Sequence, residues 1–116
     1  MPPIYIFRNE TKQVEEITIK GMPLGAFDNY HYNDQRIKLK LGDTILLLSD
    51  GLPELFNDKK EMFDYPRVKE VFTKVGDKSP ENIINHFVKA GDEWSDNGNL
   101  NDDITFVVLK VKENDR

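Results

Sequence analysis

Both helical patterns of this sequence follow one another directly, between the fourth and the last of five strand-like segments. Residues 65–75 and the segment that starts at Ser79 carry apolar residues at the spacing of one helix face. Because strands and helices do not alternate along the chain, a doubly wound parallel sheet is not the expected fold. We therefore predict an α+β fold, with a mainly antiparallel sheet and two helices.

Five short segments are typical of strands. Residues 4–7 and 14–20 flank a polar turn, which indicates a hairpin. Residues 36–41 alternate apolar and charged side chains, which predicts a half-buried strand. Residues 44–48 are almost continuously apolar, as in a strand that is covered on both faces. Residues 104–111 are β-branched and apolar, and predict the last strand.

The second helix has a clear start signal. Ser79 can cap it, Pro80 suits the first helical position, and Glu81 places an acidic side chain in the first turn. We expect Trp94, further along the same helix, to be a hydrophobic anchor and not a platform for substrate.

Composition excludes several classes of function. The 21 acidic and 16 basic side chains give a net charge of −5, which does not favour nucleic acid as a partner. The absence of cysteine excludes a thiolate zinc site, a disulfide framework and a cysteine nucleophile. No apolar run approaches the roughly 18 residues that span a bilayer, so we expect no membrane contact by this segment.

Aspartates mark the ends of two expected strands. Asp50 follows the most apolar strand and precedes Gly51, while Asp102 and Asp103 open the last strand. Neighbouring strand residues point to opposite faces, so only one of Asp102 and Asp103 can face a given site. Carboxylates are the ligands that Mg²⁺ and Mn²⁺ prefer, so two of these aspartates could share a metal. Turns and local caps also use such aspartates, and this alternative stays open.

Other polar residues give weaker signals. We expect His31, in a polar loop, and His86, on the second helix, to be surface histidines. Ser49 lies in no nucleophile-elbow motif. We therefore predict no catalytic side chain in this chain apart from metal ligands.

Several short motifs occur in one order along the chain and carry a resemblance to a known family. They are Pro2-Pro3, residues 21–25, 42–44, 46–54, 79–81 and 101–105. Together they resemble the PPM-type metal-dependent serine/threonine phosphatases, and most closely the bacterial branch of the sporulation phosphatase and the sigma-factor regulators. The resemblance covers the C-terminal half of that domain, so we expect residues 1–116 to form a partial phosphatase domain.

The resemblance implies a sandwich of two antiparallel sheets flanked by helices. It also implies two Mn²⁺ or Mg²⁺ ions, which activate a water that attacks phosphoserine or phosphothreonine. Asp50 and Asp102 match metal-binding aspartates of the family. Gly51 belongs to the same Asp-Gly motif, and Asp103 would face away and brace the start of the strand.

The chain departs from the family pattern at two points. The other metal ligands of the family lie upstream, and no segment before Pro2 carries them here. We therefore expect the isolated chain to be inactive, and whether it is itself an enzyme stays open. Asp64 also replaces a glycine that many relatives have, which puts the local backbone geometry in question.

The expected function is that of a fragment of a cytoplasmic bacterial signalling phosphatase. Its implied substrate is a phosphorylated protein such as an anti-sigma-factor antagonist. The alternatives are a non-catalytic regulatory or protein-binding module, and a small structural domain with accidental motifs. Because half of a sandwich leaves apolar faces and strand edges open, we also expect a homodimer.

Overall fold

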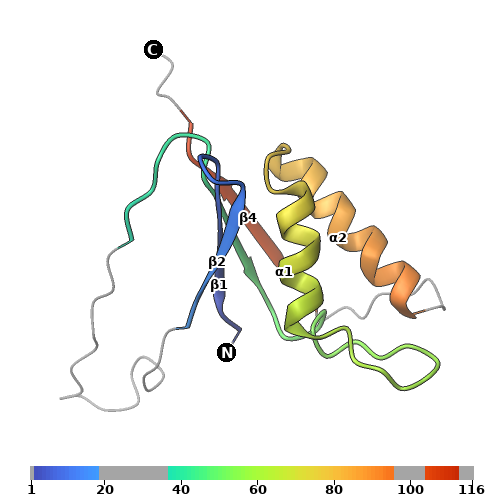
Figure 1. Cartoon of the computed structure of the whole chain (residues 1–116). Coiled ribbons are helices and arrows are strands. Elements are labelled where there is room, and N and C mark those ends of the chain that lie inside the picture. The colour runs from blue at the N-terminus through green and yellow to red at the C-terminus, as the bar shows by residue number, and fades with distance from the viewer. Residues whose placement is uncertain (1, 19–36, 96–103, 113–116) are drawn as a thin grey trace, which may run out of the picture.

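The computed structural model describes residues 2–18, 37–95 and 104–112. Its strands form one antiparallel sheet in the order β2-β1-β3-β4. Both helices lie on the same side of this sheet (Figure 1). The elements are β1 (Ile4–Arg8), β2 (Gln13–Ile17), β3 (Thr44–Leu48), α1 (Asp64–Val75), α2 (Pro80–Ser95) and β4 (Phe106–Lys110). The predicted α+β fold, with an antiparallel sheet and two helices, is confirmed.

The first two strands form the predicted hairpin. Their register runs from the pair Ile4 and Ile17 to the pair Arg8 and Gln13. The connecting turn closes where the backbone N–H of Lys12, at a φ of 59°, donates to the carbonyl of Arg8 over 2.7 Å. β1 then pairs with β3 on its other side, so β1 and β3 are the central strands of the sheet.

The predicted strand at residues 36–41 is wrong for residues 37–41, which have no regular structure. Leu39 and Leu41 are both exposed, so the alternation of apolar and charged residues does not bury a face here. The structure therefore describes four strands where the sequence predicted five.

A buried carboxylate explains this difference. Asp43 is only 1% exposed. It accepts hydrogen bonds from the backbone N–H groups of Asn9 and Lys40, both at 2.9 Å, and from the Arg8 guanidinium at 3.1 Å. The same guanidinium donates to the carbonyl of Lys38 over 2.6 Å. Side chains thus occupy the backbone groups that a strand ladder would need, and the segment before β3 curls around Asp43.

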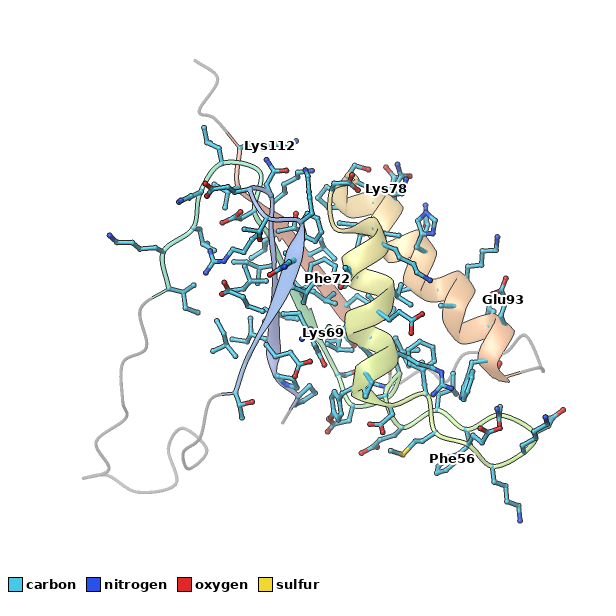
Figure 2. All side chains as sticks on the ribbon, in the orientation of Figure 1. Phe56, Lys69, Phe72, Lys78, Glu93 and Lys112 are labelled. Atoms are coloured by element: carbon cyan, nitrogen blue, oxygen red, sulfur yellow. The ribbon has the colours of Figure 1, made fainter. Side chains whose placement is uncertain are left out.

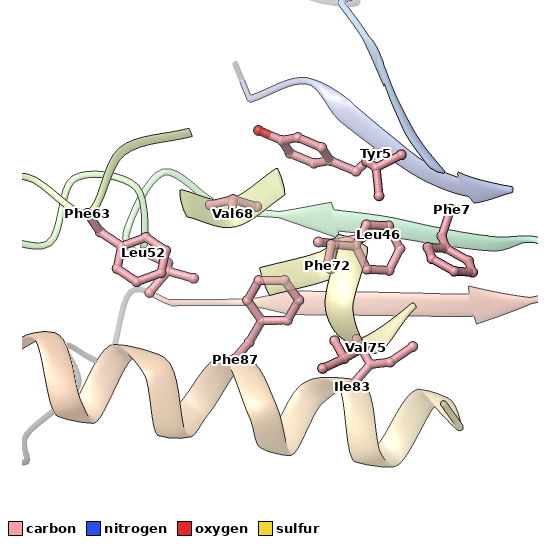
Figure 3. Packing of buried hydrophobic residues seen from close by; sticks show 11 residues of the cluster. Tyr5, Phe7, Leu46, Leu52, Phe63, Val68, Phe72, Val75, Ile83 and Phe87 are labelled. Atoms are coloured by element: carbon pink, nitrogen blue, oxygen red, sulfur yellow. The ribbon is translucent and has the colours of Figure 1, made fainter. Parts of the chain in front are cut away.

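Each helix buries one stripe against the sheet. α1 buries Val68, Phe72 and Val75, and α2 buries Ile83 and Phe87. Figure 3 shows these side chains meeting those of β1 and β3 in a single layer. The predicted cap of α2 is also present, because the hydroxyl of Ser79 accepts the backbone N–H of Asn82 over 3.3 Å.

Four phenylalanines cross the layer from one end of the sheet to the other. The ring centroids are 6.0 Å apart for Phe7 and Phe72, 6.4 Å for Phe72 and Phe87, and 5.7 Å for Phe87 and Phe106. These separations lie in the range of favourable aromatic pairs. The series therefore links β1, α1, α2 and β4 in that order.

The opposite face of the sheet is open over β3 and β4. Leu47 pairs with Val107, and Ile45 pairs with Leu109. These pairs alternate with Leu46 and Val108, which pack against the helical core, so they lie on the side away from the helices. Leu47 is 37% exposed, and both β4 residues are more exposed still. The prediction that residues 44–48 are covered on both faces is therefore wrong, because both helices of the described part of the chain pack against the same face of the sheet. Neither of the two described helices is long and apolar enough to cross a membrane.

The hydrogen bonds to Asp43 predict a pH-dependent contribution to stability. Burial raises the pKa of the Asp43 carboxyl. The N–H groups of Lys40 and Asn9 and the Arg8 guanidinium stabilise its charged form more strongly, so its net pKa lies below the ordinary value. Asp43→Asn should lower the free energy of unfolding at neutral pH by about 2 kcal/mol.

Urea denaturation across a pH series measures this effect. The pKa of Asp43 is lower in the folded protein than in the unfolded chain, where it is about 3.9. The extra stability of the wild type over Asp43→Asn is therefore complete above the unfolded pKa, and it is lost as pH falls through the folded pKa. Asp77→Asn, at an exposed aspartate, should change stability by less than about 0.5 kcal/mol. A difference between wild type and Asp43→Asn that stays constant into strong acid would contradict the assignment.

Candidate metal centre

The end of β3 and the start of β4 are held together by two hydrogen bonds. The N–H of Ser49 donates to the carbonyl of Thr105 over 3.0 Å, and the N–H of Thr105 donates to the hydroxyl of Ser49 over 2.9 Å. In an antiparallel pair these two strand ends lie at the same end of the sheet. Asp50 directly follows this junction. Asp102 and Asp103 precede Thr105 by three and two residues in the sequence and lie outside the described residues.

Asp50 is an exposed residue in a tight turn. Its carbonyl accepts the N–H of Glu54 over 3.1 Å, and the N–H of Leu55 donates to the carbonyl of Leu52 over 3.1 Å. Leu52 is fully buried and fixes the turn to the core, and Gly51 lies between it and Asp50. The turn thus holds the Asp50 carboxylate outward at the end of the sheet.

Tyr65, near the start of α1, orients this carboxylate. Its hydroxyl donates to Oδ1 of Asp50 over 3.2 Å. Partial burial raises the pKa of Tyr65, and the hydrogen bond to Asp50 raises it further, so the phenol keeps its proton at neutral pH. No sequence pattern identifies Tyr65 as a partner of Asp50, because the two residues lie fifteen positions apart.

A complete metal site needs more donors than Asp50. Magnesium and manganese ions take about six ligands, mainly oxygens. Among residues 2–18, 37–95 and 104–112, no three histidine, aspartate or glutamate side chains lie close enough together to hold an ion. Asp43, the other strand-flanking aspartate described, has its oxygens engaged by three donors and lies before β3, at the far end from Asp50. Its role is structural.

Trp94 fixes the loop that leads from Asp50 to α1. The indole Nε1–H donates to the carbonyls of Leu55 and Glu61, each over 3.0 Å. Phe63 meets the Trp94 ring edge-on with centroids 5.8 Å apart, and the Arg67 guanidinium lies 4.1 Å from the ring centroid. Trp94 is thus an anchor, as predicted, and it acts through its polar edge as well as through its ring.

The backbone at Asp64 has the geometry that its position suggested. Its φ of 67° lies in the left-handed region, where glycine is favoured. Its N–H donates to the carbonyl of Pro53 over 2.7 Å, and its own Oδ1 accepts the N–H of Tyr65 over 2.8 Å. This local hydrogen bond is a reason why aspartate can replace glycine here.

The histidine that the structure describes takes no part in the site. His86 is exposed on α2, as predicted for a surface histidine. His31 lies outside the described residues.

Comparison with known families identifies the chain. The model of the stage II sporulation protein E (SpoIIE) family matches residues 1–112. The chain belongs to the SpoIIE family. The predicted resemblance to PPM-type phosphatases is thereby confirmed, and accidental motifs in an unrelated structural domain are excluded.

Solved structures of phosphatase domains share the fold of this SpoIIE-family chain. The SiaA-PP2C domain of Pseudomonas aeruginosa matches 95% of the chain at 18% identity, with a TM-score of 0.74. The phosphatase domain of SpoIIE from Bacillus subtilis matches all of the chain at 24% identity, with a TM-score of 0.69. The chain covers 43% and 49% of these two structures, so it spans less than half the length of either. No curated protein matches the chain in sequence.

Asp64 in this SpoIIE-family chain allows a test of the left-handed backbone. Asp64→Gly should leave the free energy of unfolding nearly unchanged, because glycine removes the left-handed penalty but loses the hydrogen bond to Tyr65. Asp64→Ala should lower it by about 1 kcal/mol, because alanine keeps the penalty without the hydrogen bond. Urea denaturation of the three proteins measures this order. An alanine variant as stable as the glycine variant would exclude the left-handed conformation.

Proposed function

We propose that this chain is part of a protein-serine/threonine phosphatase and contributes Asp50 and Asp102 to its two-metal centre. The junction of Ser49 with Thr105 is the observation that carries the proposal. Ser49 directly precedes Asp50, and Thr105 follows Asp102 by three residues. The hydrogen bonds between Ser49 and Thr105 therefore hold these two parts of the chain side by side. Membership of the SpoIIE family supplies the chemical context.

The residues of the chain have distinct parts in this proposal. Bound Mn²⁺ or Mg²⁺ would activate a water and neutralise charge on the phosphoryl oxygens. Asp50 would offer a carboxylate oxygen to a cation, and Tyr65 would keep that carboxylate in one orientation. Gly51 would support Asp50 from within the same turn, and Asp103 would brace the strand start beside Asp102. Two aspartates supply too few oxygens for two ions, so we expect the isolated chain to be inactive.

The proposed substrate is a phosphoserine or phosphothreonine on a bacterial signalling protein in the cytoplasm. An anti-sigma-factor antagonist in its phosphorylated form fits the branch of the family that the motifs resemble. The Bacillus subtilis match is described as the phosphatase domain of a cell fate determinant, which supports a role in signalling.

Calorimetric titration with Mn²⁺ tests the metal site. The chain should bind Mn²⁺, and Asp50→Asn and Asp102→Asn should each abolish binding, because each removes a direct ligand. Tyr65→Phe should weaken affinity roughly tenfold, since it removes only the group that orients Asp50. Asp77→Asn is the matched control, because Asp77 is exposed and lies far from Asp50. Its neighbour Gly76 accepts the hydroxyl of Thr44 at the start of β3, whereas Asp50 follows the end of that strand.

Each pattern of results has a distinct meaning. Loss of binding in Asp77→Asn as well would show that Mn²⁺ binds to surface carboxylates in general. No binding by the wild type would favour the alternative function, a non-catalytic regulatory or protein-binding module.

A second proposal concerns the open face of the sheet. In the sandwich that the resemblance implies, a second sheet covers such a face. In the isolated chain we propose that a second copy covers it, through Leu47, Val107 and Leu109. β4 is also an edge strand of the described sheet, and exposed apolar edge strands favour association.

Sedimentation velocity over a concentration series tests the homodimer. The wild type should form a dimer as concentration rises, and Leu109→Lys should remain monomeric because it places a charge in the interface. Phe56→Lys is a matched control, since Phe56 is 56% exposed and Leu109 54%, and only Leu109 lies on the sheet face. A wild type that stays monomeric at all concentrations would refute the proposal.

A further inference from the structure

The loop between Asp50 and α1 presents two large apolar side chains to solvent. Phe56 and Met62 face each other across an isolated antiparallel bridge. Phe56 is 56% exposed and Met62 is 37% exposed. Figure 2 shows Phe56 on the outer side of this loop, beyond the first turn of α1 and directed away from both helices. We refer to Phe56 and Met62 as the loop patch.

The turn that carries the loop patch is closed by its own hydrogen bonds. Oδ1 of Asn57 accepts the N–H of Lys59 over 3.0 Å and that of Glu61 over 2.9 Å. The N–H of Asn57 donates to the carbonyl of Glu61, and Lys60 takes a left-handed φ of 61° that reverses the chain. This turn therefore has a defined shape without any contribution from the apolar pair.

The helical layer fixes the base of the same turn. Trp94 donates to one carbonyl on each arm of the turn, at Leu55 and at Glu61. Phe63 is buried against Trp94 immediately after the patch. Little conformational freedom is left for the loop to lose when a partner binds, which favours affinity.

The loop patch is not part of the hydrophobic core, unlike apolar residues close to it in the loop. Leu52 and Phe63 belong to the buried core, whereas Phe56 and Met62 do not. Single exposed apolar side chains are common on proteins, whereas contiguous exposed apolar surface marks interaction sites. Phe56 and Met62 are adjacent across the bridge, so they form such a surface on a small scale.

The patch and the proposed metal ligand belong to one structural unit. The loop starts at Asp50, and it ends at Asp64, whose N–H donates to the carbonyl of Pro53 near its start. The next residue, Tyr65, donates to the Asp50 carboxylate. A peptide whose phosphoryl group reaches the Asp50 end of the sheet would therefore place flanking residues near the loop patch.

We propose that the loop patch binds an apolar side chain close to the phosphorylated residue of the protein substrate. The inference rests on the proposed phosphatase function and adds a determinant of substrate recognition. Phe56 provides the larger contact, and Met62 adapts to side chains of different shape. Neither residue touches the phosphoryl group, so the patch selects substrates without taking part in the chemistry.

A phosphoserine peptide array tests the proposal. The full-length protein with Mn²⁺ is applied to peptides whose residues around phosphoserine are either apolar or small and polar. The wild type should retain the apolar peptides roughly tenfold better. Phe56→Ser should make retention of the two sets about equal, and Met62→Ser should reduce the difference in the same direction. Leu41→Ser is the matched control, because Leu41 is 58% exposed and lies before β3, at the far end from Asp50.

The remaining outcomes separate this inference from the proposed function. Thermal melting by circular dichroism should be unchanged in all three variants, since none of the three residues belongs to the buried core. Equal retention of both peptide sets by the wild type, or the same preference in Phe56→Ser, would refute the patch. Loss of self-association in Phe56→Ser would identify an interface between copies and also refute it. Hydrolysis of p-nitrophenyl phosphate, measured in parallel, tests the phosphatase function alone.

Discussion

The packing of four phenylalanines between sheet and helices determines most of this structure. Phe7 and Phe106 come from β1 and β4, on either side of β3, and Phe72 and Phe87 come from the two helices. Because each ring contacts the next, neither helix can shift along the sheet without breaking contacts with both neighbours. Substitution of one such ring by alanine typically costs about 3–5 kcal/mol. The same layer fixes the position of β4 beside the end of β3, and hence the place of the candidate metal centre.

The elements that sequence reasoning predicted are those with a local pattern. Helix periodicity and a serine cap located α1 and α2, and apolar runs located β3 and β4. The strand predicted at residues 36–41 failed because alternation of polar and apolar residues does not show where backbone hydrogen bonds go. Here the Asp43 carboxylate takes the N–H of Lys40, three residues away, and the Arg8 guanidinium takes the carbonyl of Lys38, thirty residues away. The second contact spans a distance in the sequence that no short window covers. Tyr65 was missed for the same reason.

Two aspartates flank β3 and illustrate how environment assigns their roles. Asp43, before the strand, is buried and receives hydrogen bonds from two backbone N–H groups and a guanidinium. A buried carboxylate whose two oxygens both accept hydrogen bonds from the protein stabilises the fold. Asp50, after the strand, is exposed and is oriented by a single phenol. The sequence pattern predicted a possible metal ligand at Asp50 and assigned no role to the Asp43 side chain, since burial is a property of the folded chain.

The geometry around Asp64 connects the core to the candidate site. A left-handed residue reverses the chain at the start of α1, and this reversal brings Tyr65 back to Asp50. The loop between them is held by Trp94 near the end of α2, whose position in turn depends on the packing of Phe87 within the same helix. The orientation of one carboxylate and the display of the loop patch therefore depend on the same helical layer. A substitution that loosens α2 would disturb the proposed metal site and the proposed recognition patch together, although α2 contributes no residue to the loop patch and no proposed metal ligand.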